Sequence, residues 1–334
     1  MRAYVMTGYG KVSDVVRLVD MPEPAAGPGQ VVCDIAAAAL NPIDLKIIAG
    51  DLKRVSRYAM PHRIGFDASG AVRAVGAGVT AFKPGDAVFV RASRDTIGTF
   101  AQTIALDASF FAPKPAKLTH VEAASLPLVG LTVVQGLVDR ARAKAGQRIL
   151  VHAGSGGVGS FAVQYAKSLG LHVTATTSGR NADFVRGLGA DEVIPYDKQD
   201  YRTLPGRYDL VLDTLGGEVT LDSFKVAKSG GAVVSIVGPP DRRFGAQVGA
   251  NPLIRLAMRF MARRVFAASR RTGVAYHRFL TESDGAQLAG IARLTEEGRI
   301  RPVIDQVFPF EALPAAFERL ATGRARGKIV LEVA

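Results

Sequence analysis

Three glycines at a fixed spacing, Gly154, Gly156 and Gly159, are the residues of this sequence best suited to hold a phosphate group. They lie between a short apolar run at 149–151 and a stretch of helical apolar spacing at 161–169. Glycines so placed permit a tight turn, let a pyrophosphate approach the backbone and bring a helix close to a strand. The start of the helix adds free N–H groups and the positive end of its dipole. Strand, turn and helix follow in the order that the motif requires. We therefore predict a dinucleotide site at Gly154, Ser155, Gly156, Gly157, Val158 and Gly159.

The residues after the next predicted strand indicate which dinucleotide would bind. That strand covers residues 172–176, and Thr177, Ser178 and Arg180 follow it. An NAD site has a carboxylate near this point for the ribose hydroxyls, whereas an NADP site offers a basic group to the 2′-phosphate. This segment contains no carboxylate, which favours NADP(H). The alternative is that Arg180 is a solvated residue before a helix capped by Asn181.

The patterns around the glycine turn alternate between strand and helix. Predicted strands at 188–194, 208–213 and 231–238 follow the first two. Strands separated by helical stretches imply right-handed crossovers and a doubly wound parallel sheet. Earlier in the chain, residues 4–118 are short strand patterns divided by Gly/Pro turns, as in a β-rich domain, and the period becomes helical at 121–141.

The last part of the chain has a different pattern. It predicts a helix at 285–298, an extended run at 301–304, a helix near 315–322 and a final strand at 328–333. We expect this tail to return and pack on the first domain.

Composition restricts the class of protein. The 334 residues are 48% hydrophobic and 22% charged, which is ordinary for a globular protein of two domains. The single cysteine, Cys33, excludes an internal disulfide and a cysteine-rich zinc site. No apolar run reaches the ~18 residues of a membrane span. The first residues enter a strand pattern without a signal-peptide core, so we expect a cytoplasmic location.

The net charge of +12 is concentrated in one segment. Residues 242–281 contain no Asp or Glu and include Arg242, Arg243, Arg255, Arg259, Arg263, Arg264, Arg270, Arg271 and Arg278. The segment has neither interleaved aromatic residues nor a nucleic-acid-binding motif, so we expect no nucleic acid as a partner.

Several other segments are distinctive in their order along the chain. They are Asn41-Pro42-Ile43-Asp44, 65–70, 82–86, 126–132, 188–191 and 323–328. With the glycine turn, they make nearly the whole chain resemble the medium-chain dehydrogenase/reductase superfamily. The most similar branch comprises the zinc-independent quinone oxidoreductases and the NADPH-dependent alkenal and enone reductases.

This resemblance implies an α/β fold with two domains. A GroES-like, β-rich catalytic domain would cover residues 1–120 and 289–334, and a doubly wound Rossmann domain that binds NADP(H) would cover 121–288. It also implies a homodimer.

The positions that hold zinc in the alcohol dehydrogenases of this superfamily differ here. Those enzymes have a cysteine where this chain has Asn41, and Gly-His-Glu where it has Gly65-Phe66-Asp67. A catalytic zinc needs about three protein ligands and an open position, and the histidines form no ligand-spaced cluster. We therefore predict no metal. Without a Lewis acid, the favoured substrates are quinones or α,β-unsaturated carbonyls, that is, enones and enals. Alcohol oxidation, the alternative chemistry, would require bound zinc.

The resemblance also implies roles for individual residues. Asn41, Asp44 and Lys46 are the catalytic candidates, and Asn41 would hydrogen-bond the acceptor oxygen as negative charge develops there. The alternative for Asn41 is a turn residue before Pro42. Asn41 and Lys46 are also expected at the cofactor, together with Thr132, Tyr196, Gly238, Arg324 and Lys328.

Some assignments remain open at this point. The basic run at 323–328 could instead be a solvated turn. Tyr58 and Tyr276 are candidates for a proton donor, with solvent as the alternative. The main functional hypothesis is an NADPH-dependent reductase of quinones or enones, and the alternative is a non-catalytic NADPH- or RNA-binding protein of the same fold.

Residues 251–265 predict an amphipathic helix after an Asn-Pro start. Its apolar positions are Leu253, Ile254, Ala257, Met258, Met261 and Ala262, and four arginines lie largely opposite. We expect a lid or a subunit-interface helix, and the competing hypothesis is a helix that lies on a membrane surface.

Overall fold

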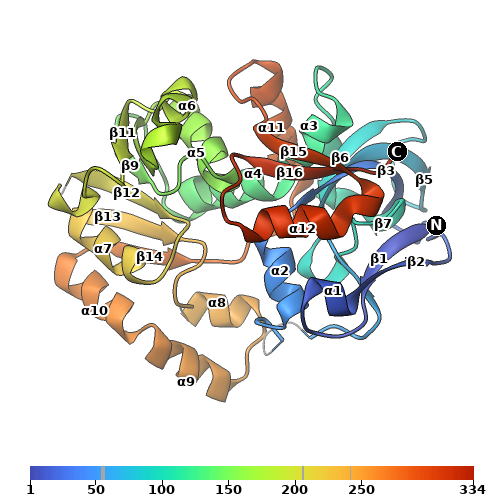
Figure 1. Cartoon of the computed structure of the whole chain (residues 1–334), viewed down its shortest axis with the longest axis horizontal. Helices are drawn as coiled ribbons and strands as arrows, with labels where there is room; N and C mark the ends of the chain where they lie inside the picture. The colour runs from blue at the N-terminus through green and yellow to red at the C-terminus, as the bar shows by residue number, and fades with distance from the viewer. Residues whose placement is uncertain (54–56, 205–206, 241) are drawn as a thin grey trace. The chain divides into compact units, whose positions relative to one another are not determined.

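The computed structural model describes residues 1–53, 57–204, 207–240 and 242–334 (Figure 1). The chain forms two compact units. Unit 1 consists of Met1–Leu131 and Glu282–Ala334, and unit 2 is Thr132–Thr281. In the described part of the chain, no helix has the length and apolar character needed to cross a bilayer.

These divisions differ from the predicted ones at 120/121 and 288/289. The helix α3 (His120–Ala124) packs on strands β3 (Gln30–Leu40) and β5 (Asp67–Val75), which belong to unit 1. Likewise α11 (Gly285–Glu296) packs on β8 (Phe111–Pro113). Both helices therefore belong to unit 1 by packing, although their helical periodicity resembles that of the nucleotide domain.

Unit 2 is built on a six-stranded sheet with the order β11-β10-β9-β12-β13-β14 (Figure 1). Every neighbouring pair is parallel. The strands are β9 (Arg148–Val151), β10 (His172–Thr177), β11 (Glu192–Pro195), β12 (Tyr208–Asp213), β13 (Ala227–Ser235) and β14 (Ala275–Arg278). In chain order this is 3-2-1-4-5-6, the doubly wound dinucleotide-binding arrangement. The predicted fold class is therefore confirmed.

Two details of this sheet differ from the prediction. Residues 188–191 form the turn after the helix α6 (Ala182–Gly187) rather than the start of a strand, because Gly189 has a φ of +102°. The edge strand β14 was not predicted, since its four residues, Ala-Tyr-His-Arg, make no apolar run.

Helices precede, connect and follow these strands. They are η3 (Gln135–Arg140), α5 (Gly157–Ser168), η4 (Gly179–Asn181), α6 (Ala182–Gly187), η5 (Tyr201–Thr203), α7 (Glu218–Val226), α8 (Arg242–Gln247), α9 (Pro252–Met261) and α10 (Arg263–Thr272). The prediction of one helix over 251–265 is wrong in one respect, because the helix breaks at Ala262. Ala262 has φ −84° and ψ 1° and is fully buried, and Val265 is almost fully buried. The predicted start is confirmed, because Asn251 Oδ1 accepts a hydrogen bond from the Ile254 N–H at 2.9 Å.

Unit 1 contains two sheets. A three-stranded sheet has the order β2-β1-β4, and a seven-stranded sheet has the order β15-β16-β3-β5-β6-β8, with β7 also paired to β3. The remaining elements of this unit are β1 (Arg2–Met6), α1 (Val12–Val15), β2 (Val16–Asp20), α2 (Pro42–Ala49), β4 (His62–Arg63), β6 (Ala87–Arg91), η1 (Arg94–Thr96), β7 (Thr103–Asp107), η2 (Ala108–Phe110), α4 (Pro127–Val134, which extends into unit 2), β15 (Ile304–Pro309), η6 (Phe310–Ala312), α12 (Leu313–Ala321) and β16 (Lys328–Glu332). The C-terminal strand β16 runs antiparallel to β3. The tail thus returns to the first domain, as predicted.

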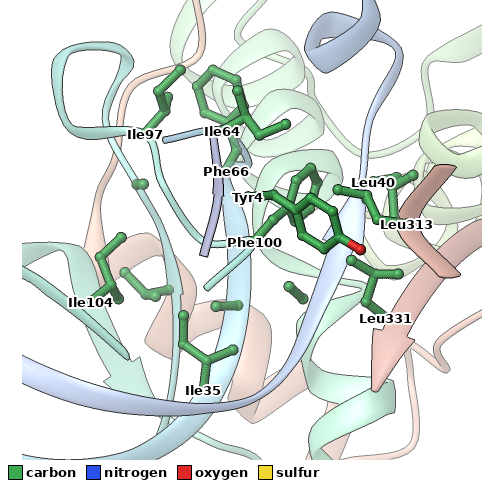
Figure 2. Packing of buried hydrophobic residues seen from close by; sticks show 14 of the residues in the cluster. Tyr4, Ile35, Leu40, Ile64, Phe66, Ile97, Phe100, Ile104, Leu313 and Leu331 are labelled. Atoms are coloured by element: carbon green, nitrogen blue, oxygen red, sulfur yellow. The ribbon is translucent and has the colours of Figure 1, made fainter. Parts of the chain in front are cut away.

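The core of unit 1 lies against this larger sheet (Figure 2). Leu40, Phe66, Phe100 and Leu331 are among its buried side chains, and Leu313 reaches it from α12. Ile47 and Ile48 of α2 are buried in the same cluster. Their burial fixes α2 on the sheet, and with it the polar residues at the start of this helix.

Candidate functional site

The glycine turn of unit 2 joins β9 to α5, and two of its glycines are required by packing. A Cβ on Gly159 would lie 2.1 Å from the Ala153 carbonyl oxygen, and a Cβ on Gly154 would lie 2.8 Å from the Ala175 Cβ. Neither distance leaves room for a methyl group. These two glycines therefore bring the helix and the neighbouring strand close to the turn.

The middle glycine has a different environment. Gly156 precedes α5 with φ −78° and ψ 178°, a conformation open to any residue. A Cβ there would come no closer than 3.5 Å to protein atoms. Packing within the protein does not explain this glycine, whereas close approach of a ligand to the backbone would. The first N–H groups of a helix have no partner inside it, so Gly157, Val158 and Gly159 can offer donors beside it.

Ser155 ties the turn to the end of β10. Its Oγ accepts hydrogen bonds from Thr177 Oγ1 at 3.0 Å and from Asn181 Nδ2 at 3.1 Å. The Asn181 side chain therefore binds Ser155 and makes no cap hydrogen bond on α6, contrary to the alternative interpretation in which Asn181 caps this helix. The Ser155 hydroxyl proton is left to donate to a ligand.

The residues predicted for the adenosine phosphate lie near one another. Arg180 is exposed on η4, Ser178 precedes that turn, and Tyr196 donates its backbone N–H to the Thr177 carbonyl at 2.9 Å. The Tyr196 side chain is 63% exposed. The structure thus brings these predicted residues to the same edge of the sheet.

Sequence reasoning missed a carboxylate at this edge. The Gly179 N–H donates to Asp197 Oδ1 at 2.9 Å, and Lys198 Cε lies 3.3 Å from where a Gly179 Cβ would be. The segment 177–180 has no acidic residue, but β11 is the parallel neighbour of β10 and delivers Asp197 just beyond its own end. The shared edge of parallel strands was the signal that could have found it.

Two other cofactor candidates of unit 2 are buried in the protein's own contacts. Thr132 Oγ1 lies 2.7 Å from Thr281 Oγ1. A Cβ on Gly238 would lie 2.5 Å from the Tyr276 hydroxyl and 2.7 Å from Ser235 Oγ, so internal packing alone requires this glycine. Tyr276 itself donates to the Pro239 carbonyl at 2.8 Å.

In unit 1, side chains at the ends of three strands meet in a buried cluster. Asn41 Nδ2 donates to Asp67 Oδ2 at 2.9 Å and to the Ala39 carbonyl at 3.3 Å. Lys328 Nζ donates to Asn41 Oδ1 and, at 3.2 Å, to Asp67 Oδ2. Asp67 Oδ1 accepts from the Leu128 N–H at 2.8 Å. We call Asn41, Asp67 and Lys328 the polar cluster, and all three are buried.

Sheet register assembles the polar cluster. On antiparallel strands, Leu40 pairs with Ile329 and Ala39 pairs with Asp67. The end of β3 therefore meets the start of β5 on one side and the start of β16 on the other. Asn41, which follows β3, reaches both Asp67 and Lys328 as a consequence.

Burial controls the charges here. It raises the pKa of Asp67, and the nearby Lys328 ammonium lowers it in opposition. Burial also raises the pKa of Asp44 to about 8, although the Asn41 backbone N–H donates to Asp44 Oδ2 at 2.7 Å. Asp44 Oδ1 has no partner among the described residues. Asp44 thus supports the backbone of Asn41 from the first turn of α2.

The structure does not bring every predicted residue into this cluster. Lys46 and Arg324 are both exposed.

Next to the polar cluster, the structure places Arg91, which the sequence analysis did not identify. Arg91 is the cross-strand partner of Asp67, lies 5.2 Å over the Phe66 ring and donates to Ser283 Oγ at 3.0 Å. Burial lowers the pKa of Arg91 to about 10. An arginine ending the apolar strand 87–91 was the available signal.

The other tyrosine considered as a proton donor is also committed. The Tyr58 hydroxyl donates to the Arg94 carbonyl at 3.0 Å, and burial raises its pKa to about 12. Like the Tyr276 hydroxyl, it donates a hydrogen bond to a backbone carbonyl oxygen.

The polar cluster does not fit a catalytic zinc ion. Lys328 places an ammonium group against Asn41 Oδ1 and Asp67 Oδ2, the oxygens that would have to bind the metal at these positions. Across the residues that the structure describes, no group of three or more His, Cys, Asp or Glu side chains could hold a metal ion.

Comparison with known proteins gives matches over the whole chain. Residues 27–116 match the family described as alcohol dehydrogenase GroES-like domain, and residues 188–331 match the family described as zinc-binding dehydrogenase. The human NAD(P)H oxidoreductase RTN4IP1, mitochondrial, is 34% identical, and the alignment covers 100% of this chain and 89% of that protein. The NADPH-dependent alkenal/one oxidoreductase, chloroplastic, of Arabidopsis thaliana is also 34% identical, over 99% of this chain and 79% of that protein.

A solved structure gives the same result. The quinone oxidoreductase from Coxiella burnetii superposes with a TM-score of 0.86 at 31% identity, covering 100% of this chain and 99% of that one.

Proposed function

Because this chain belongs to the medium-chain dehydrogenase/reductase superfamily and is an oxidoreductase, we propose that it uses NADPH to reduce quinones or α,β-unsaturated carbonyls without a catalytic zinc. The observation that carries the proposal is the bond of Lys328 to both Asn41 and Asp67. An ammonium group at this position disfavours a metal, so the acceptor must be activated by its own conjugation. The printed names of the alkenal/one and quinone oxidoreductases support this substrate class.

We propose that the glycine turn holds the cofactor. The N–H groups at the start of α5 would bind the pyrophosphate over Gly156, and Ser155 would add a hydroxyl donor. Arg180 and Ser178 would bind the 2′-phosphate, with Tyr196 beside them. Asp197 opposes this preference, but its Oδ1 accepts the Gly179 N–H and Lys198 lies next to it. We also retain Thr132, Gly238, Lys46 and Arg324 as proposed cofactor contacts, of which Thr132 and Gly238 are buried and Lys46 and Arg324 are exposed.

The polar cluster would act on the acceptor. NADPH, when bound, supplies a hydride. Both hydrogens of the Asn41 amide are used, and the 3.3 Å bond to Ala39 is the longer one. The N–H that now binds Ala39 could instead donate a hydrogen bond to the oxygen of the acceptor as that oxygen gains negative charge. Lys328 at Asn41 Oδ1 polarises the amide and makes it a stronger donor. In this scheme Asn41 is the catalytic residue, while Lys328, Asp67 and Asp44 are positioning residues.

We assign protonation of the product to solvent. Tyr58 and Tyr276 donate their hydroxyl protons to backbone carbonyls, so neither is poised to give one up. A cytoplasmic location and a homodimer complete the proposal. Gradient fractionation of the source cells and sedimentation velocity test these two points.

The decay of NADPH absorbance tests the function directly. Purified protein is mixed with NADPH and 1,4-benzoquinone, 9,10-phenanthrenequinone or a 2-alkenal, and each reaction is repeated with NADH. We expect turnover with at least one acceptor and a preference for NADPH. Cofactor binding without turnover would favour the non-catalytic binding protein. Turnover of alcohols with zinc detected by elemental analysis would favour the alcohol dehydrogenase.

The Arg180→Gln variant tests the cofactor preference separately. Loss of one charge-assisted contact to the 2′-phosphate should weaken NADPH binding about tenfold and leave NADH binding unchanged. Equal effects on both cofactors would contradict the role of Arg180.

A further inference from the structure

One face of α9 exposes large apolar side chains. Leu253, Leu256, Phe260 and Met261 are 78%, 64%, 66% and 65% exposed. Residues three and four apart lie on one side of a helix, so Leu253, Leu256 and Phe260 form a continuous surface with Met261 at its border. We call these four residues the α9 apolar face. Within α9 only Met258 is buried, and it packs toward α8 near Gly245.

The charged residues of α9 and α10 are all arginines. Arg255, Arg259, Arg263, Arg264, Arg270 and Arg271 are exposed on α9 and α10. No Asp or Glu occurs from 242 to 281. In the described part of the chain, Arg264 alone among these six has an ion pair, with the exposed Glu218. The Arg263 guanidinium lies 3.9 Å from the centroid of the Phe260 ring, so cationic and apolar groups are interleaved.

We propose that the α9 apolar face docks on the surface of an anionic phospholipid bilayer. Leu256 and Phe260 would enter the boundary between headgroups and acyl chains, and the arginines would bind the lipid phosphates. The long arginine side chains can extend from the helix to the headgroups while their methylene groups cover apolar surface. This inference concerns where the protein binds, and it is independent of the reaction proposed above.

Charge distinguishes this partner from two others. In a twofold interface between copies, the same patch lies on both sides, so the arginines would face one another without an acidic residue in 242–281 to pair with. A nucleic acid would satisfy the arginines but would leave four apolar side chains without an apolar partner. An anionic bilayer satisfies both groups.

Co-sedimentation of the intact protein with vesicles tests the proposal. The vesicles contain phosphatidylcholine alone or phosphatidylcholine mixed with phosphatidylglycerol. We expect binding to the anionic vesicles to be at least about tenfold stronger, and to weaken as salt is added, because anionic headgroups attract basic segments within a Debye length. Equal binding to both vesicles, or binding to neither, would overturn the proposal.

Three variants locate the contact. The double variant Leu256→Asp/Phe260→Asp should lose at least about tenfold in binding to the anionic vesicles, since it places charge in the apolar boundary. Arg255→Gln/Arg259→Gln should weaken binding to the anionic vesicles only. Val307→Asp is the matched control, because Val307 is an exposed apolar residue of β15 in unit 1, and it should bind as the unaltered protein does.

The outcomes separate the partners. If Val307→Asp loses as much binding as the α9 double variant, the α9 apolar face is not the contact. If the double variant instead changes the sedimentation coefficient from that of an oligomer to that of a monomer, the face joins copies of this chain and the proposal fails. Because the substituted side chains are exposed, the thermal unfolding midpoint should be unchanged and serves as a check of folding.

Discussion

The glycine turn of unit 2 and the polar cluster of unit 1 both lie at strand ends, but they are built in opposite ways. The turn is local, spans six residues from Gly154 to Gly159, and offers mainly backbone groups. The polar cluster joins side chains that are separated by 26 and 261 residues along the chain. One site follows from a short motif, whereas the other exists only once the sheet has its register.

The two sites also differ in the free-energy cost of burying them. A backbone site costs little to bury because it adds no charge. The polar cluster holds a carboxylate and an ammonium group away from water, and each is tolerated only through the other. The turn should therefore tolerate substitution unless sterics forbid it, while the cluster should be sensitive to loss of any charge.

The largest effect is expected from Lys328→Ala. It leaves Asp67 buried without its cation and should lower the free energy of unfolding by about 3–5 kcal/mol. Lys228→Ala is the matched control, because Lys228 pairs with Asp209 at 3.1 Å in a partly exposed position and should cost at most about 1 kcal/mol. Urea unfolding followed by circular dichroism measures both. Similar losses in the two variants would remove the distinction between the regions.

A pair of glycine variants sharpens the comparison inside the turn. Gly159→Ala forces a methyl group to 2.1 Å from the Ala153 carbonyl oxygen, and should cost up to about 3 kcal/mol of stability. Gly156→Ala meets only an ordinary contact at 3.5 Å and should leave the unfolding midpoint unchanged. Its effect should be on NADPH affinity, which a fluorescence titration measures. A Gly156→Ala protein that binds NADPH normally would contradict the site.

Asp44 gives an effect that is seen only as a pH dependence of stability. Burial raises its pKa from 3.8 to about 8, so the folded state prefers the protonated form. This contribution to stability is complete below about pH 4 and is lost as the pH rises toward 8. Asp44→Asn cannot ionise, so relative to the unaltered protein it should gain stability between pH 5 and pH 8, by at most about 1.4 kcal/mol per pH unit.

The control for Asp44 has the opposite sign. Hydrogen bonds from the Ser109 hydroxyl and N–H lower the pKa of Asp107, so its stabilising effect appears above its unfolded pKa and is lost on acidification. Asp107→Asn should therefore become relatively less stable as the pH rises from acid to neutral. Thermal unfolding across this range measures both variants, and parallel curves would contradict the account of Asp44.

Much of the fold was predictable from sequence because its signals are local. The glycine spacing, the apolar strand runs and the return of the tail all correspond to the structure. Lys46 is an example of a residue whose place could not be predicted from the local sequence. No helix was predicted after Asn41, but the structure has the helix α2, which buries Asp44 and exposes Lys46 two residues later. Without knowing that these residues are helical, the sequence could not show that Asp44 is buried and Lys46 is exposed.

The rest depended on contacts between distant segments. Asp67 was considered only as a residue that replaces a zinc ligand, and Arg91 and Asp197 were missed. Each takes its place from a cross-strand or neighbouring-strand relation that no local pattern contains. The break at Ala262 has the same origin, because the burial of Ala262 and Val265 decides where the helix ends.

The most direct test of the central claim, that the turn holds NADPH while the polar cluster acts on the acceptor, is turnover at saturating NADPH in Gly156→Ala and Asn41→Ala. The account predicts that Gly156→Ala recovers most of its turnover number once enough NADPH is present. Asn41→Ala should stay at least about a hundredfold slower, as expected for loss of a donor to a developing oxyanion, with unchanged NADPH affinity. Full turnover by Asn41→Ala, or an equal loss of NADPH affinity in both variants, would contradict it.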